Sequence, residues 1–259
     1  MVTDNLVVTN ADFGQFSVVA PVDRRLPGGG GYPVAGLYDV NPAFGGQSNT
    51  LATFADLLPT APLQYQRYNG FTLDVSARPR NGLLFQGGIN SGKTVTDNCA
   101  VRTLVPEISP LNPYCHSEPG FLTRWTGLMS YTIPRVDISI SGTIRSDQGA
   151  ALQANWSAPL SAIAPSLGRV LSANQQFASI NLIAPGDVWG DRVNELDLRV
   201  GKVLRFGRVR TTVGFDVYNV LNSAAVLTYN QAFVPGGAWL APLSVLTPRF
   251  AKIGVQVGF

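Results

Sequence analysis

Charged residues are scarce in this sequence. Asp, Glu, Lys and Arg make up only 14% of its 259 residues, against about 25% in average soluble domains. No run of about 18 apolar residues is present either, which excludes a transmembrane helix. A chain can otherwise cross a bilayer only as a β-barrel, whose weaker signal is an alternation of apolar and polar residues. The low charge is consistent with strands that face something other than water.

Histidine and cysteine are also scarce. His116, Cys99 and Cys115 form no CxxC pair or His-rich cluster, so we expect no metal and no other cofactor. A disulfide between Cys99 and Cys115 would close a surface loop in an oxidising compartment, and two free thiols are the alternative. His116 adjoins Cys115, but neighbours on an extended chain point apart, so we expect no catalytic triad and no enzyme.

The N-terminus lacks the basic and apolar regions of a signal peptide. We therefore expect either a chain that is not exported or a fragment of a longer or truncated exported protein. The net charge is +3, with 19 Lys and Arg residues scattered along the chain. Nucleic-acid binding needs clustered basic residues with interleaved aromatics, so no nucleic-acid partner is expected.

Alternation with a period of two is the clearest pattern present. At the end of the chain Ile253, Val255, Val257 and Phe259 share one face, and polar or small residues share the other. Such a pattern predicts a strand. The same pattern predicts seven strands in all, at 71–78, 83–89, 125–133, 136–145, 195–201, 209–218 and 249–259.

Short and long connections alternate between these strands. Tight turns are expected at 79–82, 134–135 and 207–208, and long connections at 94–120, 147–191 and 220–247. Outer-membrane barrels have short periplasmic turns and long extracellular loops. The sequence therefore predicts an all-β fold: an antiparallel transmembrane β-barrel segment of about seven or eight strands.

Residues 1–64 contain no clean strand, apart from a short one possible near Tyr32–Tyr38, and we interpret them as an extracellular loop region. Residues 65–259 are expected to hold the barrel strands. Seven strands leave two unpaired edges, so the sheet is expected to be open and strongly curved. The aromatic girdles of a barrel would include Phe71 and Trp125 on the outer side and Phe85, Tyr131 and Phe259 on the inner side.

Acidic and basic residues occupy the polar face of the predicted strands. They could suggest a catalytic pair of carboxylates, but polar-in alternation predicts them directly as the lining of a barrel lumen, paired across strands. The predicted lumen-facing residues are Asp74, Asp137, Arg145, Glu195, Asp197, Arg199, Arg210 and Asp216.

One nucleotide-binding pattern occurs, since residues 87–94 match GxxxxGK[ST] in full. Phosphate binding needs a helix directly after this pattern. The following residues, with Pro106, Pro110 and Pro113, predict no such helix. We interpret 87–94 as a glycine-rich strand that runs into a loop.

Three segments resemble the end of TonB-dependent receptors of the Oar-like kind that carry a carboxypeptidase regulatory-like domain. They are 191–199 (DRVNELDLR), 214–222 (GFDVYNVLN) and 248–259 (PRFAKIGVQVGF), and 37–42 and 68–70 are also similar. The resemblance implies a bacterial outer-membrane receptor that imports a bulky nutrient. It also implies outer-membrane lipid, an extracellular ligand and the barrel-assembly machinery as partners, the last reading the terminal strand with Ile253, Val255, Val257 and Phe259.

Transporters of this class have about 22 strands around a plug, and TonB acts on that plug. The strands predicted here are too few, so transport by this chain alone is not expected. Two other classes remain open, namely a complete small porin-like or adhesin barrel and a secreted β-sandwich binding protein, since periodicity alone does not separate them.

Overall fold

The computed structural model describes residues 2–5, 7–47, 50–53 and 64–258. Its main feature is a long antiparallel sheet with strand order β17-β13-β12-β9-β8-β6-β5, to which β7 adds at β6. The strands are β5 (Tyr65–Arg80), β6 (Leu83–Asp97), β7 (His116–Ser117), β8 (Leu122–Ile133), β9 (Ile138–Asp147), β12 (Val193–Phe206), β13 (Val209–Tyr218) and β17 (Phe250–Gly258). All seven predicted strands are therefore present, and β5, β6, β8 and β12 are longer than predicted.

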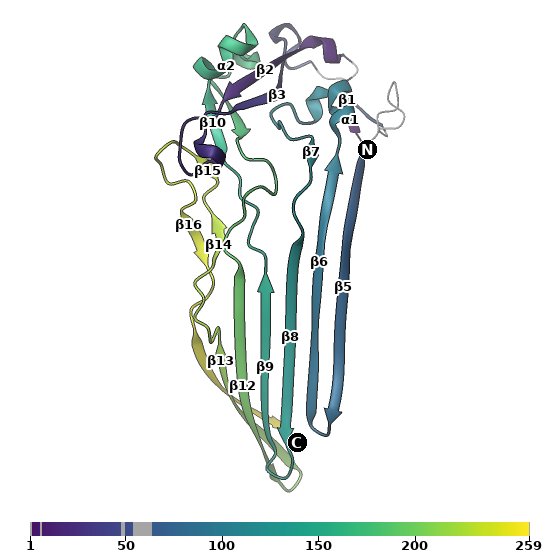
Figure 1. Cartoon of the computed structure of the whole chain (residues 1–259), viewed down its shortest axis with the longest axis vertical. Helices are drawn as coiled ribbons and strands as arrows, with labels where there is room; N and C mark the ends of the chain where they lie inside the picture. Colours follow the sequence, from purple (N-terminus) through teal and green to yellow (C-terminus); the bar gives the residue numbers. More distant parts are fainter. Residues whose placement is uncertain (1, 6, 48–49, 54–63, 259) are drawn as a thin grey trace.

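The sheet is open. Among the described residues, β5 and β17 form its two edges and do not pair with each other. Figure 1 shows the long strands side by side, with β13 and β17 curving behind β12. No closed barrel is formed by these residues.

The connections at the two ends of the sheet differ as expected. Residues 81–82 and 207–208 make short turns, and Gly207 has a positive φ of 61°, which glycine adopts without strain. The first turn is shorter than the predicted 79–82, because Pro79 and Arg80 belong to β5. The third turn corrects the prediction, because it covers four residues, 134–137, rather than two. Arg135 and Asp137 have φ values of 70° and 51° there, so Val136 and Asp137 belong to the turn and not to β9.

The other end of the sheet bears a folded cap, which we define as residues 7–47, 98–115, 118–121, 148–192 and 219–249 (Figure 1). Its strands are β2 (Phe13–Val19), β3 (Pro33–Val40), β10 (Asn155–Pro159), β11 (Phe177–Asn181), β14 (Val226–Tyr229), β15 (Ala232–Phe233) and β16 (Pro242–Val245). Its helices are α1 (Cys99–Leu104), α2 (Leu160–Leu167) and the 3-10 turns η1 (Asn10–Asp12), η2 (Pro27–Gly29), η3 (Pro42–Phe44), η5 (Pro106–Ile108) and η6 (Ser172–Asn174).

The prediction for residues 1–64 was too simple. A strand near Tyr32–Tyr38 is present as β3, but β2 pairs with it, and β1 (Val2–Asn5) pairs with β4 (Thr50–Thr53). The long connections are likewise not plain loops. β10 joins β11 antiparallel and β15 parallel, and β14 joins β16.

The hydrophobic core of the described residues lies in the cap. Phe16, Leu37, Ile163, Ile180 and Phe233 are each at most 2% exposed and belong to one cluster. These residues come from β2, β3, α2, β11 and β15, so the cap is held together by chain segments that are distant in sequence. Burial of apolar surface on this scale is the dominant stabilising force in a folded domain. The long sheet contributes no residue to this cluster.

Candidate functional site

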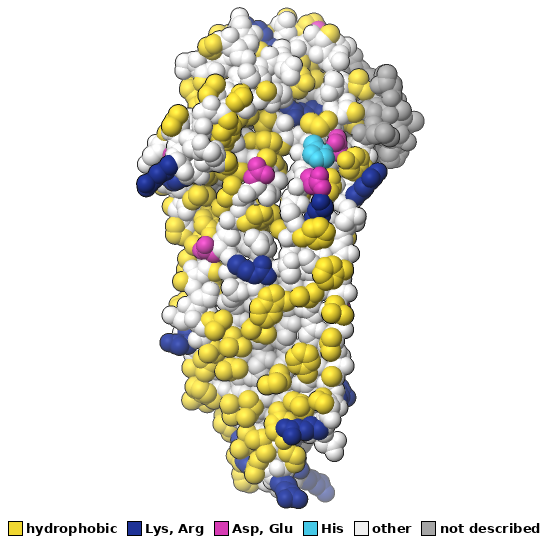
Figure 2. All heavy atoms as spheres, in the orientation of Figure 1, with side chains coloured by type: hydrophobic (Ala, Val, Ile, Leu, Met, Phe, Trp, Pro, Cys, Tyr) yellow, Lys and Arg dark blue, Asp and Glu magenta, His cyan; other side chains and the backbone are white. Residues whose placement is uncertain are grey.

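One face of the long sheet is apolar and uncovered. Cross-strand partners point to the same side of a sheet, and Tyr131, Ile140, Val200, Phe215 and Ile253 form one continuous row across five strands. The two neighbouring rows are mostly apolar, with Lys202 in one and Gly142 in the other. Figure 2 shows apolar side chains spread over the sheet. We call this face the apolar band; it comprises Leu73, Val75, Ala77, Leu83, Phe85, Ile89, Trp125, Met129, Tyr131, Ile133, Ile138, Ile140, Ile144, Leu196, Leu198, Val200, Leu204, Phe206, Val213, Phe215, Val217, Ala251, Ile253, Val255 and Val257.

Large side chains in the band are exposed to a degree that a soluble protein seldom shows. Leu73 is 62% exposed, Ile253 74% and Val255 64%. Contiguous apolar patches of more than a few hundred Å² mark interaction surfaces. Ile253, Val255 and Val257 of the terminal strand, which the barrel-assembly machinery is expected to read, lie on this face. Phe259, the fourth residue of that prediction, is outside the described residues.

Aromatic and charged residues border the band. Phe71 and Trp125 are exposed near the cap, while Phe85 and Tyr131 lie nearer the turns. Basic side chains gather at the turn end (Figure 2), where the Arg80 guanidinium lies 4.7 Å from the ring centroid of Tyr131. Long basic side chains can lie along apolar surface and keep their charge in a polar layer. The basic residues of this end are Arg78, Arg80, Arg135, Lys202, Arg205, Arg208 and Arg210.

The opposite face of the sheet is polar. Arg145 Nε donates to Glu195 Oε2 at 2.6 Å, and Arg199 Nη1 lies 3.2 Å from Asp216 Oδ1. Asp74 lies in the same cross-strand row as Arg145 and Glu195. The two arginines thus pair with carboxylates on neighbouring strands. These pairs are a structural arrangement and need no catalytic role.

The remaining predicted lumen residues are placed less uniformly. Asp197 accepts a hydrogen bond from the backbone N–H of Asn219 at 2.8 Å. Arg210 pairs with Gly258 at the turn end of β13. Asp137 is a correction, because it lies in the 134–137 turn, where its Oδ1 is 3.4 Å from Arg205 Nη2.

The phosphate-binding pattern at 87–94 lies inside strand β6, which continues to Asp97. A six-residue helix, α1, follows only at Cys99. Gly92 has another role, because a side chain at this position would collide with the ring of Tyr68. The segment therefore lacks the loop-to-helix geometry that positions phosphates.

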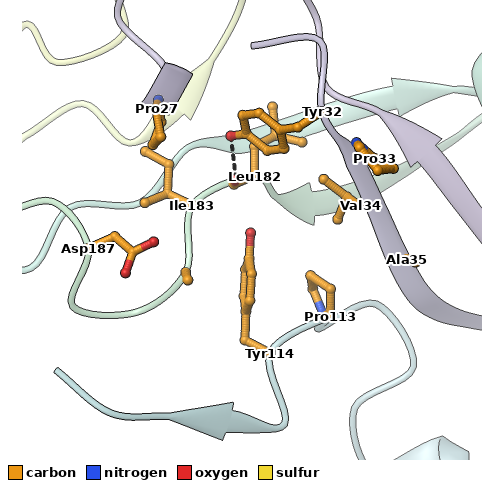
Figure 3. A pocket seen from close by; sticks show the side chains of 11 residues that line it. Pro27, Tyr32, Pro33, Val34, Ala35, Pro113, Tyr114, Leu182, Ile183 and Asp187 are labelled. Atoms are coloured by element: carbon orange, nitrogen blue, oxygen red, sulfur yellow. Dashed lines mark hydrogen bonds between the residues drawn. The ribbon is translucent and has the colours of Figure 1, made fainter. Parts of the chain in front are cut away.

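A pocket of about 330 Å³ opens in the cap, and sequence reasoning missed it. Figure 3 shows Tyr32, Tyr114 and Asp187 directed toward the same space. Tyr32 Oη donates to the carbonyl oxygen of Leu182 at 2.6 Å. Burial raises the pKa of both tyrosines, with smaller contributions from the Asp187 carboxylate and, for Tyr114, from Tyr32.

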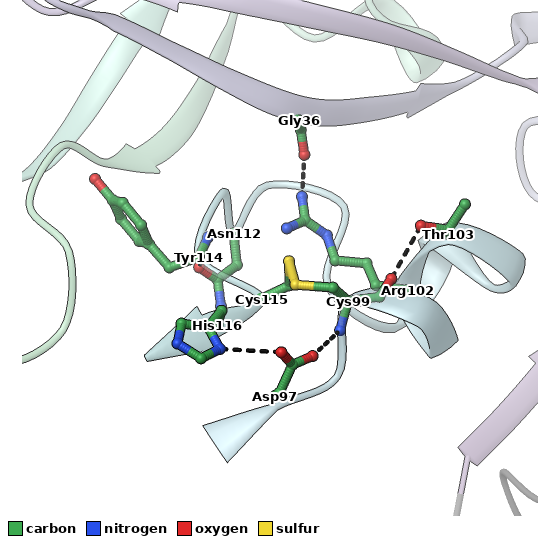
Figure 4. The surroundings of a disulfide bond; sticks show 9 residues. All are labelled: Gly36, Asp97, Cys99, Arg102, Thr103, Asn112, Tyr114, Cys115 and His116. Carbon is green, nitrogen blue, oxygen red and sulfur yellow. Dashed lines mark hydrogen bonds and ion pairs between the residues drawn. A yellow bond between two sulfur atoms is a disulfide. The ribbon is translucent and has the colours of Figure 1, made fainter. Parts of the chain in front are cut away.

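The two cysteines form a disulfide beside this pocket (Figure 4). Asp97 Oδ1 accepts the backbone N–H of Cys99, and Asp97 Oδ2 lies 3.0 Å from His116 Nδ1. These contacts, the Cys99 bond first, lower the pKa of Asp97. His116 is thus a partner of Asp97 at the base of the loop. The disulfide fixes the segment that carries Tyr114, the residue before Cys115.

The described residues contain no group of three or more His, Cys, Asp or Glu side chains arranged to hold a metal ion. No helix among them is long and apolar enough to span a membrane. Comparison with known proteins gave no matching family model, no matching curated protein and no matching solved structure.

Proposed function

We propose that this chain is the C-terminal barrel portion of a TonB-dependent receptor in the bacterial outer membrane. The long sheet would form part of the membrane wall, and the cap would face outward and bind a bulky nutrient. The observation that carries the proposal is the exposed apolar band over seven neighbouring strands, opposite a polar face with paired charges. Lipid on one side and water on the other require this division.

The asymmetry of the two ends supports the same arrangement. Short turns lie at one end, and a folded cap held by the Cys99–Cys115 disulfide lies at the other. A disulfide persists in an oxidising compartment such as the cell surface. The barrel-assembly machinery would contact β17, and TonB would act through a plug outside the described residues.

The open edges bear on the alternatives. A complete small porin-like or adhesin barrel would need β5 to pair with β17, and the described ladders do not include that pair. A β-sandwich would bury the apolar band under a second sheet, and no described segment covers it. A wall continued by further strands satisfies both edges and the band, because unpaired strand edges are not tolerated in lipid.

Tryptophan quenching tests the proposal. Trp125 lies in the band, whereas the other three tryptophans, Trp156, Trp189 and Trp239, belong to the cap. The chain would be reconstituted into vesicles that contain lipids brominated on their acyl chains. We expect quenching in the unchanged protein and its loss in Trp125→Phe. Equal fluorescence of Trp125 with and without bromine would refute the membrane wall.

The receptor assignment needs its own test. An antibody against the cap would be used on fractionated cells of the source organism. We expect the antigen in the outer-membrane fraction, in a species much larger than this chain. An antigen confined to a soluble fraction would reject the whole proposal, and an outer-membrane species of the size of this chain would reject the TonB-dependent receptor.

A further inference from the structure

The pocket between Tyr32, Tyr114 and Asp187 has a distinct chemical character. Its other lining residues are Pro27, Pro33, Val34, Ala35, Pro113, Leu182, Ile183 and Ala184. Among the described residues, Asp187 is therefore the one charged residue that lines this pocket. A volume of about 330 Å³ suits a small ligand or one end of a larger ligand.

The polar groups of the pocket are mostly acceptors. The hydroxyl hydrogen of Tyr32 is used on the Leu182 carbonyl, which leaves the Tyr32 oxygen as an acceptor. Asp187 is exposed and has no ion-pair partner among the described residues, so its carboxylate is available. Only the Tyr114 hydroxyl remains as a side-chain donor. Anionic ligands find no basic side chain in this lining.

The aromatic rings complete the arrangement. Figure 3 shows Tyr114 edge-on, with one face of its ring turned toward the side where Asp187 lies. A cation is attracted by the face of an aromatic ring and by a carboxylate. A phenol is neutral below its pKa, and burial raises the pKa of Tyr114 from its ordinary value. Pro33 and Pro113, which adjoin the two tyrosines in sequence, and Pro27 add apolar surface for methyl groups.

We propose that this pocket binds an organic ammonium group, held between the face of Tyr114 and the carboxylate of Asp187. The inference goes beyond the proposed function, since it concerns the cap alone and holds whether or not the sheet contacts lipid. The disulfide supports the site, because it anchors the segment from which Tyr114 projects.

A matched pair of probes tests the proposal. Choline and its neutral carbon analogue 3,3-dimethylbutan-1-ol have nearly the same shape. The full chain would be kept in octyl glucoside micelles, and binding would be measured by saturation-transfer NMR on the probe methyl groups. We expect choline to bind about tenfold more tightly than the alcohol, from the cation–π and charge contributions together. Equal affinities of the two probes, or no detectable binding of choline, would overturn the proposal.

Two variants locate the site. Asp187→Asn removes the charge from an exposed side chain and should weaken choline binding by about fivefold, without a change for the alcohol. Asp74→Asn makes the same charge change on the polar face of the sheet and should leave choline affinity as it is. Equal weakening in both variants would show a general charge effect and reject the pocket, and so would unchanged affinity in Asp187→Asn.

Discussion

Phe215 and Ile253 face each other across the ladder between β13 and β17, and both side chains remain exposed. Apolar cross-strand pairs stabilise a sheet most when their outer surface is also removed from water. An apolar pair that is exposed in this way is stabilised when a non-aqueous phase covers it. On the proposed function that phase is the acyl region of the outer membrane.

A charge placed in the band should therefore impair membrane incorporation. Ile253→Arg should cost about 2–4 kcal/mol of stability in the bilayer, the range for basic residues on the lipid face near its middle. The measurement is urea unfolding from vesicles. Gln256→Arg lies on the opposite face of the same strand and serves as the control, with an expected change below about 1 kcal/mol. Equal effects at the two positions would argue against lipid on the band.

The cap should depend on one buried ion pair that joins distant segments. Asp39 binds Arg169 Nη1, and its carboxylate also accepts from Ser172 Oγ at 2.7 Å. The two charged side chains are 8% and 26% exposed. Asp39→Asn leaves a largely buried guanidinium unpaired, so we expect the cap to lose about 3 kcal/mol. Denaturant unfolding followed by fluorescence of the buried Trp239 measures this loss.

The control for that variant is Glu195→Gln. It breaks the Arg145–Glu195 pair, in which the arginine is 47% exposed, and exposed pairs contribute at most about 1 kcal/mol. A cap equally stable in Asp39→Asn and Glu195→Gln would contradict the role given to Asp39.

The disulfide should stabilise the cap through the loop it closes. Cys99 and Cys115 are 16 residues apart, and a loop of this length corresponds to about 3 kcal/mol. Reduction should lower the denaturant midpoint of the cap. It should also speed the exchange of backbone amide hydrogens with solvent in the segment between the two cysteines. The double variant Cys99→Ser/Cys115→Ser should already have the lower midpoint and should not respond to reductant. An unchanged midpoint after complete reduction would show that the disulfide contributes nothing.

Acid should weaken the base of this loop. Asp97, beyond the apolar band at the cap end of β6, has a lowered pKa, first because of the Cys99 N–H and then because of His116. A carboxylate with a lowered folded pKa stabilises the protein above its unfolded pKa, here about 3.8, and this contribution is lost as the pH falls through the folded value. The stability difference between the unchanged protein and Asp97→Asn should shrink as the pH falls from 6 to below 3.8. A constant difference would exclude this linkage.

The long sheet could be predicted because its strands alternate without interruption. Leu196, Leu198 and Val200 alternate with charged residues, and β12 has that register. A turn after Ile133 could also be predicted, but its extent to residue 137 could not. Val136 continued the apolar alternation, although Arg135 and Asp137 on either side of it adopt positive φ. A turn of this kind depends on backbone conformations that non-glycine residues seldom adopt.

The cap was the harder part to predict. A local signal for β2 existed, because buried Phe16 and Val18 alternate with Gln15 and Ser17. The shared pocket of Tyr114 and Asp187 had no such signal, because these lining residues come from separate connections between strands. Such long-range contacts carry no short periodicity for sequence reasoning to detect.

Accessibility along β12 tests the membrane wall most directly. Single cysteines from Glu195 to Val203 would carry a nitroxide label, with the native disulfide intact and no other free cysteine in the described residues. In vesicles we predict a period of two, with Leu196, Leu198 and Val200 accessible to oxygen dissolved in lipid and Asp197, Arg199 and Gly201 accessible to a water-soluble nickel complex. Equal access of the nickel complex to both sets would contradict a sheet with one face in lipid.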